Sequence, residues 1–403
     1  MAIDNKDKKV LNVPPLRFPE FTEEWEETTL GKISEITKGS GISKDQLSEQ
    51  GSPCILYGEL YTKYKSEIID EVYSRTELDS SSLVKSKAND VIIPCSGETA
   101  IDISTARCVP FNNILLGGDL NIIRLKHDDG GFFAYQLNGA RKKDIARVAQ
   151  GVSVVHLYGE NLKHIRVYHP AIEEQKKITR LLSLIDERIA TQNKIIEDLK
   201  KLKSAISKQA FAQKPNGWNR LDTLFSKGKA GGTPTSTNKE YYNGEMPFLS
   251  INDITKQGKY VRYTENHLSR SGLENSSAWV VPEYSLIISM YASVGLVTIN
   301  EVPITTSQAM FAMQLRDKDL LDYLYYYLSY FKYRHIHKYL ETGTQSNINA
   351  DIVRGIMIPT YGHSRNMKIA STLQSIDAKI DNELSVLKLF NRQKNYLLSQ
   401  MFI

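Results

Sequence analysis

The sequence predicts a mixed α/β fold in which one unit, a globular head followed by a long helix, occurs twice along 403 residues. Residues 177–211 and 368–402 match at regularly placed positions. Each of them follows a segment in which short apolar runs alternate with loops rich in Gly, Ser, Asn and Thr. The repeat distance of about 190 residues is too long for a solenoid and suits a duplicated domain.

The two long segments keep their residue identities, whereas the heads keep mainly the spacing of strands and glycines. Two interpretations of this contrast remain open: each head reads a different target, or a duplicated fold has drifted. The matched pairs in the long segments are Ile178 with Ile369, Leu182 with Leu373, Ile185 with Ile376, Asp186 with Asp377, Ile189 with Ile380, Lys203 with Lys394, Gln209 with Gln400 and Phe211 with Phe402.

Apolar residues in both long segments step by four and three, the rhythm of a coiled coil. Gln192 and Glu383 interrupt the seam midway, and Lys203 and Lys394 interrupt it further on. Because polar seam residues fix register, we expect one preferred alignment of the helices. An antiparallel coiled coil would relate the heads by a pseudo-two-fold axis; a hairpin that only braces the fold is the alternative. Further apolar residues off the seam suggest additional protein partners: Leu181, Leu184, Ile195 and Leu202.

Within the heads, strands are expected at residues 90–94, 120–125, 285–289 and 308–315, and helices at 132–147 and 320–340. The last helix is rich in tyrosine, which favours a core with solvated hydroxyls over a platform that stacks bases. The predicted partition is an N-terminal segment at 1–20, a first target-reading domain at 21–169, a first long helix at 170–212, a second target-reading domain at 213–362 and a second long helix at 363–403.

Motifs for catalysis and metal binding are missing from the sequence. It contains no Gly-x-x-x-x-Gly-Lys-Ser/Thr loop, and Asn12-Val13-Pro14-Pro15-Leu16 lacks the aromatic residue of an adenine methyltransferase motif. His335 and His337 are two residues apart, so on a helix they point in different directions. We therefore expect a binding protein with no catalytic residues, no metal and no cofactor of its own.

Composition adds few constraints on the partner. The net charge of +5 permits a polyanionic partner without requiring one. The three cysteines, Cys54, Cys95 and Cys108, lack metal-site spacing and are expected to be buried free thiols. With no apolar run of about 18 residues and no signal-peptide core at the start, a cytoplasmic location is expected.

Residues that read DNA bases should be loop residues with hydrogen-bonding side chains at matching places in both heads. Asn and Gln can pair with adenine, Lys with guanine or phosphate, and Glu or Asp can accept from cytosine. Such residues also build ordinary loops, so each has a structural alternative. The first-head candidates are Lys38, Ser40, Tyr57, Glu59, Lys63, Lys65, Ser96, Gln150 and Ser153. The second-head candidates are Thr233, Thr235, Asn252, Asp253, Tyr291, Ser307, Gln308, Thr344, Gln345, Ser346 and Asn347.

With these motifs in view, the chain resembles the specificity (S) subunit of type I restriction-modification systems. The resemblance begins at Leu16-Arg17-Phe18-Pro19-Glu20-Phe21 and is most specific at Pro170-Ala171-Ile172-Glu173-Glu174-Gln175-Lys176-Lys177-Ile178 and in Leu182-Ser183-Leu184-Ile185-Asp186-Glu187-Arg188-Ile189. The second copy departs at its start, where His363-Ser364-Arg365-Asn366 replaces Ile172-Glu173-Glu174-Gln175.

The resemblance implies two target recognition domains, each reading half of a bipartite site in double-stranded DNA, separated by two helices in an antiparallel coiled coil. It also implies two methyltransferase (M) subunits that bring S-adenosylmethionine and restriction (R) subunits that use ATP and Mg. A self-contained methyltransferase or nuclease with an unrecognised motif, and a coiled-coil scaffold without nucleic acid, are the alternatives. Repeated apolar identities on the helices are the positions expected at the subunit interface: Ile178, Leu182, Ile185, Ile189, Ile369, Leu373, Ile376 and Ile380.

Overall fold

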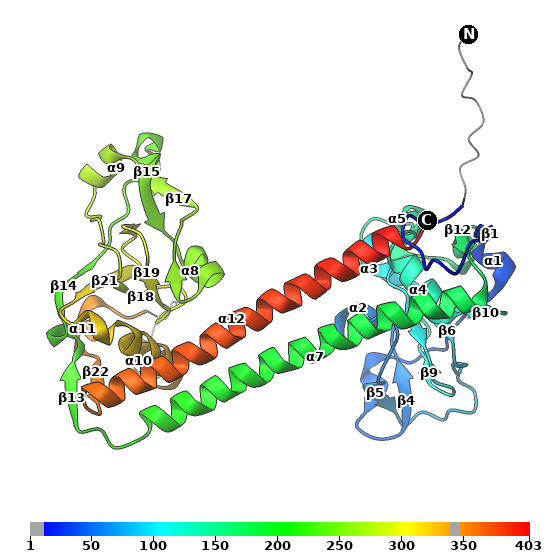
Figure 1. The fold of residues 1–403 in the computed structure, drawn as a ribbon, viewed down its shortest axis with the longest axis horizontal. Helices are drawn as coiled ribbons and strands as arrows, with labels where there is room; N and C mark the ends of the chain where they lie inside the picture. The colour runs from blue at the N-terminus through cyan, green and yellow to red at the C-terminus, as the bar shows by residue number, and fades with distance from the viewer. Residues whose placement is uncertain (1–11, 339–346) are drawn as a thin grey trace, which may run out of the picture. The chain divides into compact units, whose positions relative to one another are not determined.

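The structure is a computed structural model that describes residues 12–338 and 347–403. The chain divides into two compact units. The first unit contains residues 1–194 and 385–403, and the second contains residues 195–384. Each unit thus combines one head with one half of each long helix (Figure 1).

The first head is built on an antiparallel sheet in the order β2-β10-β6-β8. A second sheet, β3-β5-β4-β9, pairs β4 and β9 in parallel. Two short ribbons, β1 with β12 and β7 with β11, complete the head. The strands are β1 Glu26–Thr29, β2 Ser34–Lys38, β3 Leu47–Ser48, β4 Ser52–Ile55, β5 Ser74–Thr76, β6 Asp90–Pro94, β7 Ser96–Gly97, β8 Arg107–Val109, β9 Leu115–Leu116, β10 Leu120–Leu125, β11 Val155–His156 and β12 Arg166–His169. The helices are α1 Leu30–Ile33, η1 Lys44–Gln46, α2 Glu59–Thr62, α3 Ala100–Ile103, α4 Gly130–Asn138, α5 Lys142–Val148 and α6 Gly159–Lys163.

The second head repeats this plan with variations. Its main sheet has the order β14-β21-β18-β19-β16, and β15 pairs in parallel with β20 as β4 does with β9. Its strands are β13 Gly217–Arg220, β14 Phe225–Ala230, β15 Tyr242–Leu249, β16 Tyr260–Val261, β17 Asn266–Leu268, β18 Leu286–Ser289, β19 Val297–Asn300, β20 Thr305–Thr306, β21 Met310–Leu315 and β22 Met357–Thr360. Its helices are η2 Leu221–Thr223, η3 Lys239–Tyr241, α8 Ile251–Gln257, α9 Arg270–Glu274, η4 Lys318–Leu320, α10 Leu321–Arg334, η5 Ile336–Lys338 and α11 Ala350–Gly355.

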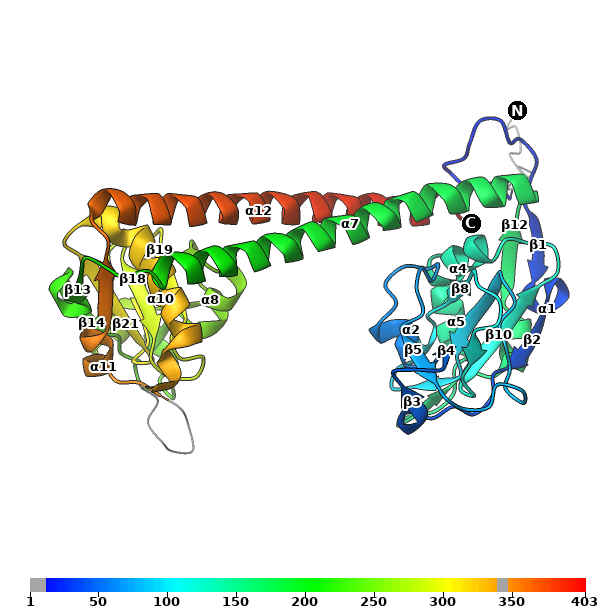
Figure 2. The same ribbon diagram turned by 90° about the horizontal axis from the view of Figure 1, so that it is seen from below.

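Both long helices are present, α7 at Ile172–Phe211 and α12 at His363–Gln400. Within the first unit, the N-terminal half of α7 lies beside the C-terminal half of α12, and within the second unit the other two halves meet. In both units the helices therefore run antiparallel, as predicted. Figure 2 shows the strands of the first head on one side of the N-terminal half of α7.

The expected strands are confirmed at β6, β10, β18 and β21, but the helix expected at residues 132–147 is two helices. Gly139 ends α4, and its N–H donates to the carbonyl of Tyr135. The tyrosine-rich α10 is mainly core, as the sequence favoured. Tyr323 and Tyr327 are buried and donate their hydroxyls to the carbonyls of Pro359 and Met357.

The core of each head is closed by the end of a long helix. In the first head, the ring of Phe402 lies 5.2 Å from that of Phe132 and 6.4 Å from that of Trp25. In the second head, Phe211 lies 5.3 Å from Tyr327 and packs among the α10 tyrosines. Phe211 and Phe402 are a matched pair of the internal repeat, so the repeat conserves a core contact. Among the described residues, no helix has the length and apolar character needed to cross a membrane.

Candidate nucleic-acid interface

In the first head, several loops that carry predicted residues meet at one edge, here called the first loop edge. It consists of residues 39–41, 95–97, 117–119 and 155–157. The backbone N–H of Gly39 donates to Leu120 at 3.0 Å, and the N–H of Ser40 donates to Leu116 at 2.9 Å. The N–H of Cys95 donates to Asp119 at 2.7 Å, so the ends of β2 and β6 are fixed to the turn between β9 and β10.

The second head builds the same edge from residues 231–233, 290–292, 307–309 and 347–348, here called the second loop edge. Gly231 donates to Met310 at 3.0 Å, Gly232 to Thr306 at 2.9 Å and Met290 to Ala309 at 2.7 Å. These bonds repeat those of Gly39, Ser40 and Cys95 position for position. Leu157 donates to Cys95 at 2.8 Å as Ile348 donates to Met290 at 3.0 Å, which extends the equivalence to the fourth loop.

Glycine is required where these loops cross. A Cβ on Gly39 would lie 2.0 Å from the carbonyl oxygen of Gly117, and a Cβ on Gly231 would lie 2.0 Å from that of Thr306. No side chain fits at such distances. The same two carbonyls crowd this position in both heads, those of Leu116 and Gly117 in the first and those of Thr306 and Ser307 in the second. The side chains that follow the crossing are free to differ.

A cleft of about 950 Å³ opens beside the first loop edge. Gly41, Gly117 and Gly118 form part of its lining, together with Tyr61 of α2 and Lys63, which directly follows that helix. Lys44 and Asp119 also line it, although sequence reasoning did not select them. Nothing in their local sequence distinguishes them from other charged loop residues.

The structure brings most first-head candidates to this edge and cleft. Tyr57, Glu59 and Lys63 line the cleft. Lys65 lies elsewhere, in a hollow shared with Ile189 of α7. Ser40 and Ser96 belong to the loop edge, where Ser40 forms a β-bridge with Gly117 and Ser96 pairs with His156. Lys38 at the end of β2 and Gln150, which forms a β-bridge with His156, flank the edge, and Ser153 is exposed in the adjoining loop.

Second-head candidates also gather at their loop edge. Thr233 and Gln308 are joined by a hydrogen bond across it, and Ser307 and Tyr291 lie on its loops. Asn347 precedes Ile348 at the fourth loop. The other described candidates lie outside the edge: Thr235 is exposed two residues beyond Thr233, and Asn252 on α8 donates to Glu265 at 3.0 Å. Thr344, Gln345 and Ser346 lie outside the described residues.

Two candidates that occupy matching places, Glu59 and Asp253, are both buried and internally bonded. Glu59 accepts from the backbone N–H of Leu56 at 3.0 Å and from Lys63 at 2.6 Å. Asp253 accepts from the backbone N–H of Ser250 at 2.8 Å and belongs to the capping box of α8. Their observed partners stabilise the helix starts.

The residues expected at the subunit interface need a correction. Leu182 and Leu373 are fully buried within this chain, and Ile178, Ile185 and Ile380 are nearly so. A side chain without exposed surface cannot contact another subunit directly. Ile178, Leu182 and Ile185 instead belong to the core of the first head and Leu373 to that of the second. Ile189, Ile369 and Ile376 are only partly buried.

Other apolar side chains on the long helices do face solvent. Leu184, Ile195 and Leu202 on α7, which the sequence placed off the seam, are exposed. On α12, Leu389 and Tyr396 are about 60% exposed. The repeat partners of these two are Asp198 and Ala205. The exposed apolar surfaces of α7 and α12 therefore differ even though their buried surfaces match.

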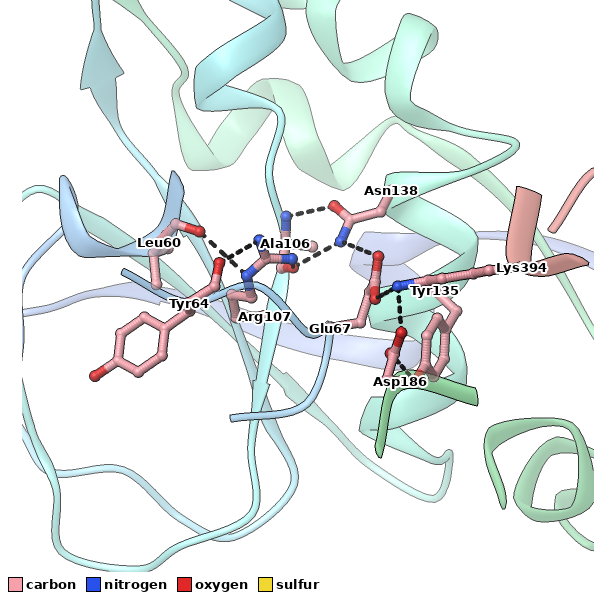
Figure 3. Close-up of polar contacts among 9 residues, drawn as sticks. All are labelled: Leu60, Tyr64, Glu67, Ala106, Arg107, Tyr135, Asn138, Asp186 and Lys394. Carbon is pink, nitrogen blue, oxygen red and sulfur yellow. Dashed lines mark hydrogen bonds and ion pairs between the residues drawn. The ribbon is translucent and has the colours of Figure 1, made fainter. Parts of the chain in front are cut away.

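A buried charge cluster joins the first head to both long helices (Figure 3). Lys394 of α12 donates to Glu67 at 2.5 Å and lies 2.6 Å from Asp186 of α7, which also accepts from the hydroxyl of Tyr135 at 2.7 Å. Although burial opposes ionisation, Lys394 lowers the pKa of Glu67, whereas burial and the nearby Glu67 raise the pKa of Asp186. Arg107 lies next to the cluster and donates to the carbonyls of Leu60 and Tyr64.

The second unit contains the matching arrangement. Lys203 donates to Asp377 at 2.5 Å, and Tyr326 donates to the other oxygen of the same carboxylate at 2.8 Å. Each lysine of the repeat thus binds the aspartate of the other long helix. The expectation that these seam positions favour one alignment is consistent with this exchange, since a shift along either helix would separate both pairs.

The start of α7 is anchored by residues of its most specific motif. Glu174 accepts two hydrogen bonds of 2.7 Å from Arg17, and Gln175 donates to Asp128 at 2.8 Å. Asp128 also faces His169 at 3.2 Å, which raises the pKa of His169. Although burial opposes it, hydrogen bonding to His169 and Gln175 lowers the pKa of Asp128.

The start of α12 uses its different residues in a similar way. Asn366, at the position of Gln175, accepts from the N–H of Tyr361 at 3.0 Å. Arg365, at the position of Glu174, donates to Gln213 in the segment before the second head. Both helix starts are therefore bonded to the chain that precedes a head, although no residue type is shared.

The cysteines are buried free thiols, as expected. Burial raises the pKa of Cys54 and Cys95 to about 11 and that of Cys108 to about 12. In the described parts of the chain, no three His, Cys, Asp or Glu side chains are grouped as a metal ion would need.

Known proteins share this sequence pattern and this fold. The chain is 25% identical over 158 residues to the Type I restriction enzyme MjaIX specificity subunit of Methanocaldococcus jannaschii, covering 38% of this chain and 36% of that protein. It is 32% identical over 113 residues to the HindI specificity subunit of Haemophilus influenzae, covering 28% of this chain and 24% of that protein. The aligned parts thus span about a third of one relative's length and a quarter of the other's.

Solved structures extend the similarity in fold to almost the whole chain. The crystal structure of a type I restriction-modification S subunit from M. genitalium superposes with a TM-score of 0.64 at 16% identity, covering 97% of this chain and 99% of that one. A structure described in connection with complex assembly and conformational transition of the type I R-M system gives a TM-score of 0.60 at 17% identity, covering 96% and 99%.

A family model ties these observations together, because it matches the chain twice and covers both heads. The model for the type I restriction modification DNA specificity domain matches residues 22–201 and 215–388. The two matches follow the internal repeat and include most of both long helices. The chain therefore belongs to the family of type I restriction-modification DNA specificity domains and carries two copies of that domain.

Proposed function

We propose that this chain is the sequence-recognition subunit of a type I restriction-modification complex and reads one half of a bipartite DNA site with each head. The observation that carries the proposal is the loop edge. The same backbone hydrogen bonds recur in both heads, while the side chains that the loops display differ. Such a design keeps the geometry of approach to DNA and changes the bases that are read.

In this proposal, the long helices set the gap between the half-sites. An α-helix rises about 1.5 Å per residue, and B-DNA about 3.4 Å per base pair. The cross-helix bonds of Lys203 and Lys394 favour one alignment of the helices, which would keep the gap constant.

The same helices would serve as a scaffold for two methyltransferase subunits and for restriction subunits. Solvent-exposed Leu202 on α7 and Leu389 on α12 are apolar surfaces that partner subunits could cover. S-adenosylmethionine, ATP and Mg would then be bound by those partners, and this chain would contribute no catalytic residue.

A domain exchange tests the two-head arrangement. Residues 216–360 would be replaced by the equivalent head of another family member, and DNA methylation by the assembled complex would be mapped by sequencing. We expect one half-site to change and the other to remain. A change in both half-sites, or in neither, would contradict the proposal.

A second experiment tests the role of the helices. Seven residues inserted after Lys194 and seven after Leu384 would add about 10 Å to each helix, close to three base pairs, and would preserve the heptad phase. We expect the gap to lengthen while both half-sites stay the same. The purified chain incubated with DNA and labelled S-adenosylmethionine provides the catalytic control, since methyl transfer without partner subunits would show that the chain is itself an enzyme.

A further inference from the structure

Thr233 and Gln308 of the second head face each other across the second loop edge, and their equivalents in the first head are glycines. Gly41 lies two residues after Gly39, as Thr233 lies two residues after Gly231. Gly118 follows Gly117, as Gln308 follows Ser307. The shared backbone hydrogen bonds fix this correspondence without reference to side chains.

The facing arrangement holds in both heads. In the second head, the hydroxyl of Thr233 donates to Oε1 of Gln308. In the first head, a Cβ on Gly118 would lie 3.1 Å from the Cα of Gly41, so these positions are also opposite each other. The first head leaves the place of this pair bare, and both glycines line its cleft. The two heads therefore share the backbone at these positions and differ in the side chains that it carries.

Gln308 is held by the hydrogen bond from Thr233. Both side chains are exposed, so DNA can reach them. The hydroxyl of Thr233 occupies one lone pair of Oε1, which leaves the second lone pair and two N–H donors of the amide. An amide fixed in advance loses less side-chain entropy on binding than a free one.

From this geometry we propose that Gln308, positioned by Thr233, reads an adenine in the half-site of the second head. In the major groove, adenine presents N7 as an acceptor and its N6 amino group as a donor, which match the N–H and the remaining lone pair of the amide. The first head, with glycines at these places, reads the corresponding base pair with other side chains of its cleft. This inference rests on the proposed function, because it names a residue of the same recognition surface.

The alternative is that the pair only braces two loops. A brace would affect folding or overall binding, but it would not change which base is preferred at one position. The test must therefore measure base preference as well as stability.

The experiment uses the full chain assembled with its methyltransferase subunits, and base preference at each position of the site is measured by methylation of a randomised DNA library. Gln308→Ala should reduce discrimination at one position by about 5- to 150-fold, the range expected for loss of a bidentate pair. Gln308→Glu should shift that position from adenine to cytosine, because a carboxylate accepts from the cytosine amino group. Thr233→Val should weaken discrimination there and keep adenine as the preferred base.

Gln393→Glu, an exposed change of the same type on α12, is the matched control and should leave both half-sites unchanged. The inference is wrong, and Gln308 only braces the loops, if the complex carrying Gln308→Glu methylates DNA with unaltered base preferences. It is also wrong if that complex loses activity equally at all positions of the second half-site while the first half-site is still read. In that case the proposed function stands. If the unchanged complex methylates no bipartite site, the proposed function itself fails.

Discussion

The ammonium of Lys394 in α12 lies 2.6 Å from the carboxylate of Asp186 in α7. The equivalent contact in the other direction joins Lys203 of α7 to Asp377 of α12. The two bonds are equivalent in the repeat, but their surroundings differ. The side chains of Lys394 and Asp186 are only 12% and 7% exposed and share the site with Glu67, whereas those of Lys203 and Asp377 are 29% and 23% exposed. The same pair of residues should therefore contribute differently to stability in the two units.

Replacing Lys394 by Met should lower the free energy of unfolding of the first unit by about 3–5 kcal/mol, because Glu67 and Asp186 would stay buried after losing the cation that pairs with both of them. Denaturant unfolding of the purified chain measures this loss. The loss should shrink at lower pH, since protonation neutralises the unpaired carboxyl groups. Lys203→Met is the matched control and should cost about 1 kcal/mol or less; equal costs for both variants would refute the explanation.

The contact between His169 and Asp128 predicts a pH-dependent contribution to stability at the start of α7. The pKa of His169 is raised, so its contribution is complete below about pH 6.5 and is lost as the pH rises through the folded-state value. The pKa of Asp128 is lowered, so its contribution is complete above about pH 4 and is lost as the pH falls through its folded-state value.

His169→Gln should therefore destabilise the chain by about 1 kcal/mol near pH 5.5 and by less near pH 8. Thermal unfolding at the two pH values provides the measurement. His164→Gln, an exposed neighbour in the sequence, should show no such difference. A His169→Gln penalty that is the same at both pH values would mean that the ion pair is not the source.

Removing the aromatic ring that closes a core should affect one unit only. Phe402→Ala deletes the ring beside Phe132 and Trp25 and should cost about 3–5 kcal/mol. Hydrogen exchange should increase in β10 and α4 of the first head while β21 of the second head stays protected. Phe211→Ala should give the reverse pattern, and a variant that raises exchange in both heads alike would argue against separate cores.

Exposed apolar residues on the helices should matter for assembly and not for folding. Leu202→Ser and Leu389→Ser should leave the melting temperature within about 2 °C, since surface changes are usually worth less than about 0.5 kcal/mol. Binding of methyltransferase subunits, followed by light scattering after gel filtration, should weaken by at least about tenfold for one of them. Leu182→Ser, a buried change, should instead impair folding.

The long helices and central strands could be predicted because their signals are local. The heptad rhythm places α7 and α12, and uninterrupted apolar runs place β6 and β10. Gly130 and Gly131 begin α4, and a Cβ on Gly131 would lie 2.5 Å from Thr179 of α7. That requirement comes from a residue almost fifty positions away, and no local pattern contains it.

The candidate site could be predicted in part. Loops at matching places in the two heads do converge, and Thr233, Ser307 and Gln308 meet at one edge. Asp253 fits the same sequence pattern, because a residue that caps a helix and one that binds a base have the same side-chain chemistry. Leu182 fits the pattern of a subunit interface, because repeated apolar residues look alike in the sequence whether they contact a partner or build the core of their own head.

The position of Phe402 in the first head has a consequence for synthesis of the chain. The second unit is continuous from residue 195 to 384, whereas the first is completed only by residues 385–403. We therefore expect the later-made head to become protease-resistant on the ribosome before the head made first, and arrested nascent chains can show the order. On this expectation, the core of the first head stays open until residues 385–403 have left the ribosome.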